Sequence, residues 1–285
     1  MRIRLALAAL VAVLSVLAGV PVAASASASA TLPAVKVVTF NLCGNVCRYG
    51  EVAATAGNIA YRVRKVGASV VMLQELCYTQ FLGIRGRLAR YGYTAEFAAA
   101  SSGGHCDDDD HKHGKAFGIA LIARGVMTGK VVYRLPNPSA TNPSATNPSG
   151  TSSEASSSEG RVVLAATVRL PGRAIFAATT HTALGANLPV QLGAIRRWLV
   201  PLAARQPLVF GGDLNTEPQS TDLDDFYAAF NEANVDRVKP MSTFIPPPAR
   251  KIDYLFGSKG FLTPTWVGRA NTGYSDHDMY MGTFR

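Results

Sequence analysis

The chain has 285 residues, of which 48% are hydrophobic and 16% are charged, and its formal net charge is +9. This hydrophobic fraction excludes a wholly disordered chain, and the lack of a Gly-X-Y or heptad period excludes collagen-like and coiled-coil proteins. The length is enough for one large core or two small ones. Composition therefore indicates a globular protein with a basic bias and leaves its activity open.

The first thirty residues are predicted not to belong to the fold. Arg2 and Arg4 precede an apolar run over 5–20, and alternating small residues follow over 23–30. A positive start, a short apolar core and A-x-A sites are typical of a secretory signal peptide, with cleavage expected between residues 24 and 30. The alternative is an uncleaved membrane anchor, but the run is short for a span of ~20 residues and no stop-transfer charges follow. Cleavage removes Arg2 and Arg4 and takes the net charge from +9 to +7. The pattern thus predicts a secreted protein without a transmembrane segment.

Export makes the four cysteines candidates for disulfide bonds. Three pairings are open, and the Gly-Asn turn within 43–47 favours Cys43 with Cys47, which leaves Cys77 with Cys106. The second bridge would close a loop of about thirty residues, worth on the order of 3–4 kcal/mol in the chain-entropy model. The alternative is a zinc site that joins Cys106 to the histidines of 105–113. No C-x2-C pair supports it, and an oxidising compartment disfavours it.

Apolar patterning predicts strands that alternate with helices. In chain order we expect strand 35–42, helix 51–66, strand 69–74, helix 79–90, strands 118–122, 130–135, 162–170 and 174–180, helix 190–202, strand 208–210, helix 223–231, and strands 252–256 and 277–284. Strands with helices between and outside them indicate an α/β fold with large sheets. Some neighbouring strands lack helical crossovers, so the sheets are expected to be mixed or antiparallel.

Two polar insertions interrupt this pattern. Residues 101–115 contain Asp107–Asp110 and three histidines, which we interpret as a solvated loop, with a structural Ca²⁺ site as the alternative. Residues 137–160 repeat Asn-Pro-Ser-Ala-Thr and then become Ser-rich, a composition that cannot bury enough apolar surface to order itself. We predict a flexible surface insert within one domain spanning residues 31–285.

Polar residues recur immediately after the apolar strand segments, where side chains from separate strands can converge on one sheet edge. They are Asn41, Gln74, Glu75, His181, Asp213, Asn215, Asp253, Asp276 and His277. Mg²⁺ takes one or two carboxylates and neutralises phosphate charge, and a histidine oriented by an aspartate can donate a proton near neutral pH. Together these residue types predict a site that hydrolyses phosphate esters.

The ordered motifs resemble those of the endonuclease/exonuclease/phosphatase superfamily, which includes deoxyribonucleases, abasic-site endonucleases, neutral sphingomyelinases and inositol-polyphosphate 5-phosphatases. The matching segments are Val37–Asn41 (VVTFN), Val71–Glu75 (VMLQE), Gly118–Arg124 (GIALIAR), Thr179–His181 (TTH), Gly212–Asn215 (GDLN), Lys251–Phe256 (KIDYLF) and Ser275–His277 (SDH). They cover essentially the whole mature chain. The resemblance implies a four-layer α-β-β-α sandwich in which two mixed β-sheets pack face to face between helices.

The resemblance also implies roles for the matching residues. Glu75 corresponds to the main Mg²⁺ ligand, assisted by Asn41, with Asp276 as a further candidate near the metal. Mn²⁺ and Ca²⁺ are alternative ions. Asp213 corresponds to the aspartate that orients or deprotonates the attacking water, and Asn215 to the residue that hydrogen-bonds the phosphate.

Two histidines complete the implied site. His277, held by Asp253, resembles the pair that binds the phosphate and assists proton transfer. His181 corresponds to the second histidine of the deoxyribonuclease and sphingomyelinase branches and is expected to act as the general acid. Lys115, just before a predicted strand, is a candidate contact for the substrate phosphate.

The substrate is less defined than the site. Basic side chains on two predicted helices favour DNA or RNA: Arg62, Arg64, Lys65, Arg85, Arg87 and Arg90. A sphingomyelinase-like phospholipid phosphodiesterase would need an exposed aromatic wedge, and a small-molecule phosphatase a compact Lys/Arg cluster; neither is evident. A catalytically inactive binding module could share the fold, but the complete set of site residues argues against it. We expect a secreted, monomeric, Mg²⁺-dependent phosphodiesterase, with a nuclease favoured.

Overall fold

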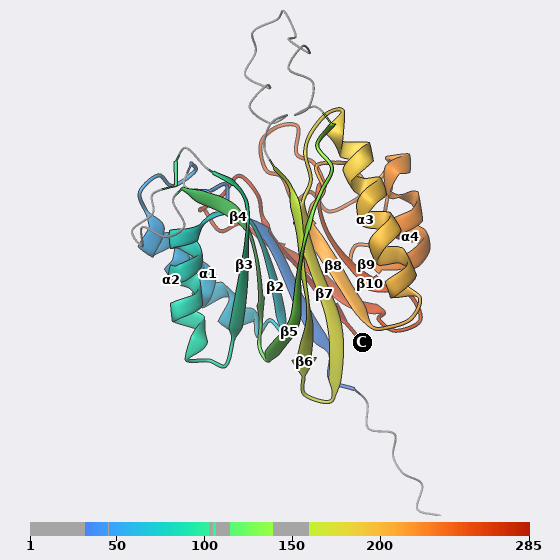
Figure 1. Cartoon of the computed structure of the whole chain (residues 1–285), viewed down its shortest axis with the longest axis horizontal. Coiled ribbons are helices and arrows are strands. Elements are labelled where there is room, and N and C mark those ends of the chain that lie inside the picture. Colours follow the sequence, from blue (N-terminus) through green and yellow to red (C-terminus); the bar gives the residue numbers. More distant parts are fainter. Residues whose placement is uncertain (1–31, 45, 103–104, 107–114, 139–159) are drawn as a thin grey trace, which may run out of the picture. The chain divides into compact units, whose positions relative to one another are not determined.

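The structure, a computed structural model, describes residues 32–44, 46–102, 105–106, 115–138 and 160–285. The predicted signal peptide, most of the 101–115 loop and residues 139–159 of the Ser-rich insert lie outside these described residues. Within Leu32–Arg285, two six-stranded sheets pack face to face, and helices cover the outer face of each (Figure 1). The predicted sandwich of two mixed sheets is confirmed.

The first sheet has the strand order β11-β12-β1-β2-β4-β3. β1 (Val35–Asn41) and β2 (Val70–Cys77) run parallel and are joined by helix α1 (Val52–Val66), whereas the other neighbouring strands are antiparallel. Helix α2 (Tyr78–Ala89) follows β2 directly. The remaining strands are β3 (Thr94–Ser102), β4 (Ala116–Ala123), β11 (Pro264–Ala270) and β12 (Met279–Phe284).

The second sheet has the order β5-β6-β7-β8-β10-β9. Here β7 (Arg173–His181) and β8 (Leu208–Asp213) form the parallel pair, joined by helix α3 (Asn187–Ala203). The antiparallel strands are β5 (Val126–Arg134), β6 (Val162–Leu170), β9 (Phe230–Glu232) and β10 (Asp253–Ser258). A 3-10 turn at Thr221–Leu223 and helix α4 (Asp224–Ala229) connect β8 to β9. Each sheet therefore contains one parallel pair.

Three buried apolar layers hold the sandwich together. Met72 and Leu164 lie in the layer between the two sheets, and Ile59 in the layer under α1 and α2. Leu199 and Phe226 lie in the layer under α3 and α4. Each fully buried side chain of this size contributes about 1.5–3 kcal/mol of transfer free energy. The packed layers fix the sheets relative to each other, so residues at the strand ends are held in place.

Helix α1 follows the predicted pattern closely. It buries Ile59 and Val63 on the face toward the sheet and ends at Gly67. Gly67 has a φ of 66°, a left-handed conformation that glycine adopts without a steric penalty, and its N–H bonds to the end of the helix. Arg64 and Lys65 occupy the last turn, where positive charge complements the helix dipole.

The sequence patterns missed strands at the sheet edges. β3 and β11 are edge strands with mostly half-exposed or exposed side chains, so their sequences lack a strong apolar alternation. The helix expected over 223–231 is shorter, because Phe230 leaves it to begin β9 and pairs with Ser258 of β10. Tertiary pairing outweighs local helical spacing at that point.

Both predicted disulfides are confirmed. Cys43 is bonded to Cys47 with a Cα–Cα distance of 5.7 Å, and Cys77 to Cys106 with one of 5.3 Å. Cys106 therefore has no thiol for the alternative zinc site. Among the helices that the structure describes, none has the length and apolarity needed to cross a membrane.

Candidate active site

The predicted site residues meet at one edge of the sandwich because of the strand directions. Asn41, His181 and Asp213 are the last residues of β1, β7 and β8. Asp253 instead begins β10, and His277 comes two residues before β12. β10 and β12 run antiparallel to β8 and β1, so their starts lie beside the ends of those strands. The expectation that every site residue immediately follows a strand is therefore wrong for Asp253, Asp276 and His277.

Asn41 is hydrogen-bonded to two of the acidic residues of the site. Its Nδ2 donates to Glu75 Oε1 at 2.8 Å and to Asp213 Oδ2 at 3.0 Å. Its Oδ1 accepts a hydrogen bond from the backbone N–H of Cys43 at 2.8 Å, which fixes the orientation of the amide. Because β1 and β8 belong to different sheets, Asn41 links the two halves of the sandwich at the site.

Gln74, the neighbour of Glu75, does not reach this edge. It is fully buried between the sheets, where its Oε1 accepts from the Thr39 hydroxyl at 3.1 Å and its Nε2 donates to Thr179 Oγ1 at 3.0 Å. A β-bulge between Leu73 and Leu76 separates the two side chains, since Gln74 faces the core and Glu75 is partly exposed. Gln74 is therefore part of the scaffold.

Two site residues have a left-handed backbone. Glu75 has a φ of 49° and Asn215 a φ of 48°. Asparagine tolerates this conformation, but for glutamate it is uncommon and costs on the order of 1 kcal/mol or more. Such outliers concentrate at functional sites, because the surrounding structure over-determines them. The strained backbone of Glu75 turns its carboxylate toward Asn41.

His277 and Asp253 form a buried pair. The His277 Nδ1 lies 2.8 Å from Asp253 Oδ2, and its Nε2 lies 3.6 Å from Asp213 Oδ2. Burial lowers the pKa of His277, but the negative charges of Asp253, Asp213 and Asp276 outweigh it and raise this pKa to about 10. The imidazole is therefore cationic at neutral pH and directs its Nε2 toward the carboxylates.

Asp213 has the environment of a proton acceptor. It is almost completely buried, accepts from the Asn215 N–H at 2.9 Å, and lies close to Asp253. Burial and the charge of Asp253 raise the pKa of Asp213 to about 7, despite the opposing effects of His277 and Asn41. A general base is most effective when its pKa lies near the working pH, and Asp213 meets that condition.

His181 has a partner that the motifs do not reveal. Arg161, just before β6, is buried and contacts His181 Nδ1 through Nη1. Burial, Arg161 and His277 lower the pKa of His181 well below its usual value. His181 is therefore neutral at neutral pH, which does not favour the expected role as a protonated general acid. Arg161 directly follows the Ser-rich insert, and no sequence pattern marks it.

Asn215 packs beside His181. Its Nδ2 donates to the carbonyl of Thr182 at 2.8 Å and lies 3.1 Å from His181 Nε2. The side chain thus connects the end of β7 with the Asp213 turn. Its predicted hydrogen bond to phosphate remains a prediction.

The donors at this edge fit a hard divalent cation. Ligand atoms of Glu75, His181 and Asp213 lie within 4.8 Å of one another, and so do those of Asp213, Asp253 and His277. Carboxylate oxygens form most of the set, as Mg²⁺, Mn²⁺ and Ca²⁺ prefer. Asp253 Oδ1 is buried without a hydrogen-bond partner among the described residues. Such an acidic, under-neutralised cluster is what a cation would stabilise.

Asp276 lies at the side of this cluster. Its carboxylate is grouped within 4.8 Å of the sulfurs of Cys43 and Cys47, and it accepts from the Ser275 hydroxyl at 3.3 Å. Its backbone carbonyl accepts from the N–H of Ile245 at 2.8 Å. The predicted metal role of Asp276 remains a prediction.

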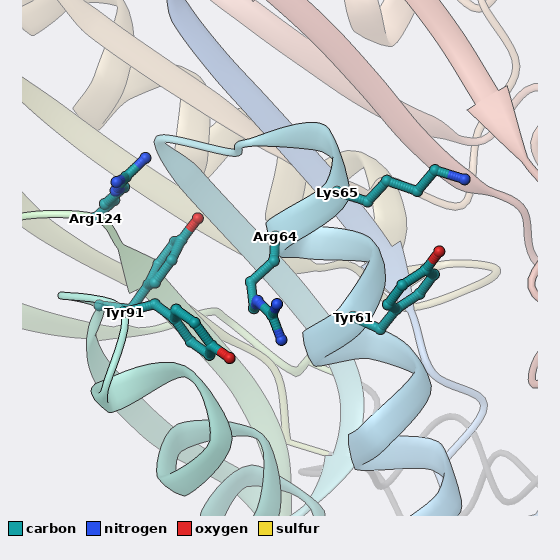
Figure 2. Close-up of a pocket in the computed structure, with 6 residues that line it drawn as sticks. Tyr61, Arg64, Lys65, Tyr91 and Arg124 are labelled. Atoms are coloured by element: carbon teal, nitrogen blue, oxygen red, sulfur yellow. The ribbon is translucent and has the colours of Figure 1, made fainter.

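Arg64 and Lys65, two of the basic residues expected to contact substrate, lie away from the site. Lys115 is exposed just before β4, at the end of the sheet where Phe117 of β4 pairs with Cys77 of β2. Arg64 and Lys65 line a separate pocket with Tyr61, Tyr91 and Arg124 (Figure 2). Val70, the first residue of β2, pairs with Ala123 of β4, and Arg124 comes next in the chain. The pocket is therefore at the opposite end of β2 from Glu75. Arg64, Lys65 and Arg124 therefore do not line the candidate active site.

Lys251 and Glu232 form a buried ion pair next to Asp253 that the motifs did not predict. Lys251 Nζ is 3.2 Å from Glu232 Oε1, both side chains are inaccessible, and Nζ also donates to the backbone carbonyl of Asp253. The Tyr280 hydroxyl donates to the same Glu232 oxygen at 3.0 Å. Burial lowers the pKa of Lys251, while Glu232 opposes this shift. The pair anchors the start of β10.

Comparisons with known proteins agree with this geometry. The family model "Endonuclease/Exonuclease/phosphatase family" matches residues 38–277. No curated protein sequence matches the chain.

Several solved structures share the fold. The human Nocturnin catalytic domain with bound sulfate is 18% identical, over 89% of this chain and 94% of that chain, with a TM-score of 0.66. D. rerio TDP2 with a single-strand DNA product is 15% identical, over 88% and 99%, with a TM-score of 0.62. A mannosyl-6-phosphatase from Bacteroides thetaiotaomicron is 14% identical, over 88% and 99%, with a TM-score of 0.63. At such identities the likeness shows the fold alone.

Proposed function

Because the chain belongs to the endonuclease/exonuclease/phosphatase family, whose members hydrolyse phosphoric esters, we propose that it is a secreted, divalent-metal-dependent phosphodiesterase that cleaves nucleic acid. The observation that carries the proposal is the convergence of Asn41, Glu75, Asp213 and the His277–Asp253 pair on one edge of the sandwich. This set provides acidic ligands, a base and a cationic donor in one place.

In this proposal Asp213 accepts the proton of the attacking water. Its pKa of about 7 allows it to be deprotonated before attack and protonated after it. His277 is cationic, and its Nε2–H donates to a non-bridging phosphate oxygen while Asp253 holds Nδ1. Asn41 donates to the carboxylates of both Glu75 and Asp213 and so holds them at a fixed distance from each other. The neutral His181 and Asn215 line the other side of the phosphate position.

Glu75, with Asn41 and Asp213 beside it, would hold the cation, and Asp276 is a further candidate. When bound, a divalent cation neutralises phosphate charge and stabilises the leaving oxygen. The oxygen-rich donor set favours Mg²⁺ or Mn²⁺ over a thiolate-loving metal, since all four cysteines are in disulfides.

The substrate and the location rest on separate observations. Tyr274 stacks against the Arg48 guanidinium at 5.2 Å, three residues before His277, and Tyr49 is 68% exposed nearby in sequence. Aromatic and guanidinium faces of this kind stack on unpaired bases. The net charge, which is +9 for the whole chain and +7 without Arg2 and Arg4 of the predicted signal peptide, supports a polyanionic substrate. Both disulfides fit an oxidising, extracellular compartment.

The test is an assay of purified residues 31–285 with Mg²⁺ or with EDTA. Single-stranded DNA, plasmid DNA, RNA, sphingomyelin vesicles and mannose 6-phosphate serve as parallel substrates. We expect Mg²⁺-dependent cleavage of nucleic acid that is lost in Glu75→Gln and His277→Ala. Activity that survives EDTA or His277→Ala overturns the mechanism, whereas cleavage of lipid or sugar phosphate alone overturns only the substrate.

A further inference from the structure

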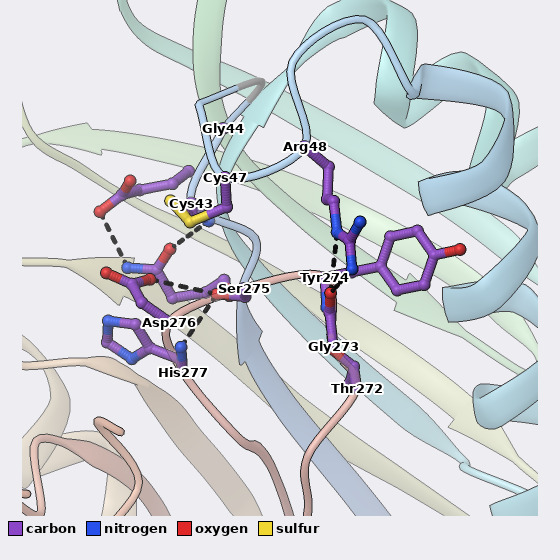
Figure 3. The surroundings of a disulfide bond; sticks show 12 residues. Cys43, Gly44, Cys47, Arg48, Thr272, Gly273, Tyr274, Ser275, Asp276 and His277 are labelled. Carbon is purple, nitrogen blue, oxygen red and sulfur yellow. Dashed lines mark hydrogen bonds between the residues drawn. A yellow bond between two sulfur atoms is a disulfide. The ribbon is translucent and has the colours of Figure 1, made fainter. Parts of the chain in front are cut away.

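One short loop contacts three chain segments of the candidate site, those that carry Asn41, Glu75 and Asp276. The disulfide between Cys43 and Cys47 closes this loop directly after β1, two residues beyond Asn41. Arg48 follows the second cysteine. We call residues 43–48 the disulfide loop; Asn45 within it lies outside the described residues. Figure 3 shows the loop against the segment that contains Asp276 and His277.

The first half of the loop holds Asn41 and Glu75. The Cys43 N–H donates to Asn41 Oδ1 at 2.8 Å, and the Gly44 N–H donates to the Glu75 carbonyl at 2.6 Å. Cys43 and Gly44 have φ values of 57° and 56°, so two successive residues are left-handed. For cysteine this conformation is strained. The adjacent covalent bridge holds the chain in the turn that these two hydrogen bonds require.

The second half of the loop holds the segment with Asp276. The Arg48 Nε and Nη2 donate to the Gly273 carbonyl at 2.9 and 2.7 Å, and the guanidinium lies over the Tyr274 ring (Figure 3). The two sulfurs of the bridge are grouped within 4.8 Å of an Asp276 carboxylate oxygen. The Ser275 hydroxyl donates to the Asn41 carbonyl at 2.8 Å, so this segment is also tied to β1.

Gln80 extends the same network to the end of β2. This side chain is buried, donates to the Gly44 carbonyl at 2.9 Å, and accepts from the Cys77 N–H at 2.9 Å. Cys77 is itself two residues beyond Glu75 and bonded to Cys106. Asn41 and Glu75 are thus each followed, two positions later, by a cysteine in a disulfide.

We propose that the disulfide loop positions Glu75 and Asp276 for the cation, Glu75 partly through the Asn41 amide, and that the Cys43–Cys47 bridge sets metal affinity more than it sets stability. The inference rests on the proposed function, because it needs a cation at Glu75. The entropic stabilisation by a disulfide grows with the length of the loop it closes. This bridge spans a sequence separation of 4, against 29 for the other. Its contacts, in contrast, are concentrated at the site.

The experiment compares Cys43→Ser/Cys47→Ser with the wild-type chain by calorimetric titration of the metal-free proteins with Mn²⁺ and Mg²⁺. Groups that orient metal ligands typically change affinity 10–100-fold when they are removed, so we expect the metal Kd to rise at least tenfold. Hydrogen exchange of amides 272–277 in the metal-free protein is expected to accelerate. Arg48→Ala, which keeps the bridge, is expected to weaken metal binding severalfold and serves if the cysteine variant fails to fold.

Leu199→Ala is the matched control for stability. Leu199 is a fully buried residue of α3 in the apolar layer outside the second sheet, whereas the disulfide loop follows β1 of the first sheet, so its truncation lowers Tm without touching the loop. Its metal Kd is expected to stay within twofold of wild type. The inference is overturned if Cys43→Ser/Cys47→Ser and Arg48→Ala bind metal like wild type while Glu75→Gln does not. If Glu75→Gln itself binds metal normally, the proposed metal site is overturned as well.

Discussion

The side-chain amide of Asn41 donates to Glu75 at 2.8 Å and to Asp213 at 3.0 Å, and these two acids belong to different sheets. One amide group therefore sets the spacing between a candidate metal ligand and a candidate base. It also connects the two halves of the sandwich at the edge where substrate would bind. The relative position of the sheets is in this way coupled to the geometry of the site.

Asn41→Ala is expected to reduce kcat by 10–100-fold while the fold is retained. Its amide hydrogen bond lowers the pKa of Asp213, so its loss raises that pKa above about 7. The acidic limb of the pH–rate profile should then move to higher pH. A kcat that falls with no change in the profile would show that Asn41 acts on Glu75 alone.

Asp253→Asn is expected to lower the pKa of His277 by at least one unit from about 10 toward its usual value near 6.5. The carboxylate that raises this pKa is removed, while burial continues to lower it. NMR titration of the His277 ring protons in the metal-free protein measures the shift directly. In the activity profile, the His277 ring should lose its positive charge at a lower pH than in wild type, so the alkaline limb should move to lower pH. An unchanged His277 pKa would contradict the assigned pair.

The metal-free protein is expected to lose stability as the pH rises from about 4 to about 7. The unfolded Asp213 carboxyl releases its proton near pH 3.9, whereas burial and Asp253 hold the folded pKa at about 7. Between these two pKa values the folded state binds one more proton than the unfolded state. The contribution of this proton to the free energy of unfolding is therefore complete below about pH 4 and is lost as the pH rises to about 7. Urea unfolding in EDTA should show a decline of roughly 1–3 kcal/mol for wild type relative to Asp213→Asn. A parallel pH dependence in the two proteins would refute the assignment.

Lys251→Met is expected to destabilise the protein by about 3–5 kcal/mol, because it leaves the Glu232 carboxylate buried and unpaired. The double variant Lys251→Met/Glu232→Gln should recover part of the loss, since the remaining group is neutral. Lys251 also donates to the Asp253 carbonyl, so both variants should reduce kcat. Thermal and urea unfolding measure the first effect. Equal stability of the single and double variants would mean that the ion pair is not the source of the loss.

The strength of the local sequence signal decided how much of the fold could be predicted. The parallel pairs β1–β2 and β7–β8 are buried, so their continuous apolar runs predicted them well. The edge strands β3 and β11 have few buried side chains and were missed. The disulfide pairing followed from the spacing of the cysteines and the turn between Cys43 and Cys47.

By itself, the sequence determined the fold class, the disulfides and the residues that meet at the candidate site, because strand ends and short motifs are local features of the chain. Only the tertiary structure decided which charge lies next to which. In the folded chain Arg161 contacts His181, and Lys251 donates to the backbone carbonyl of Asp253. Arg64 and Lys65 lie at the end of β2 opposite to Glu75. These relations depend on sheet order and strand direction, which bring together residues far apart in the chain. In the same way, burial and neighbouring carboxylates within the sandwich together set the pKa values of His277 and Asp213.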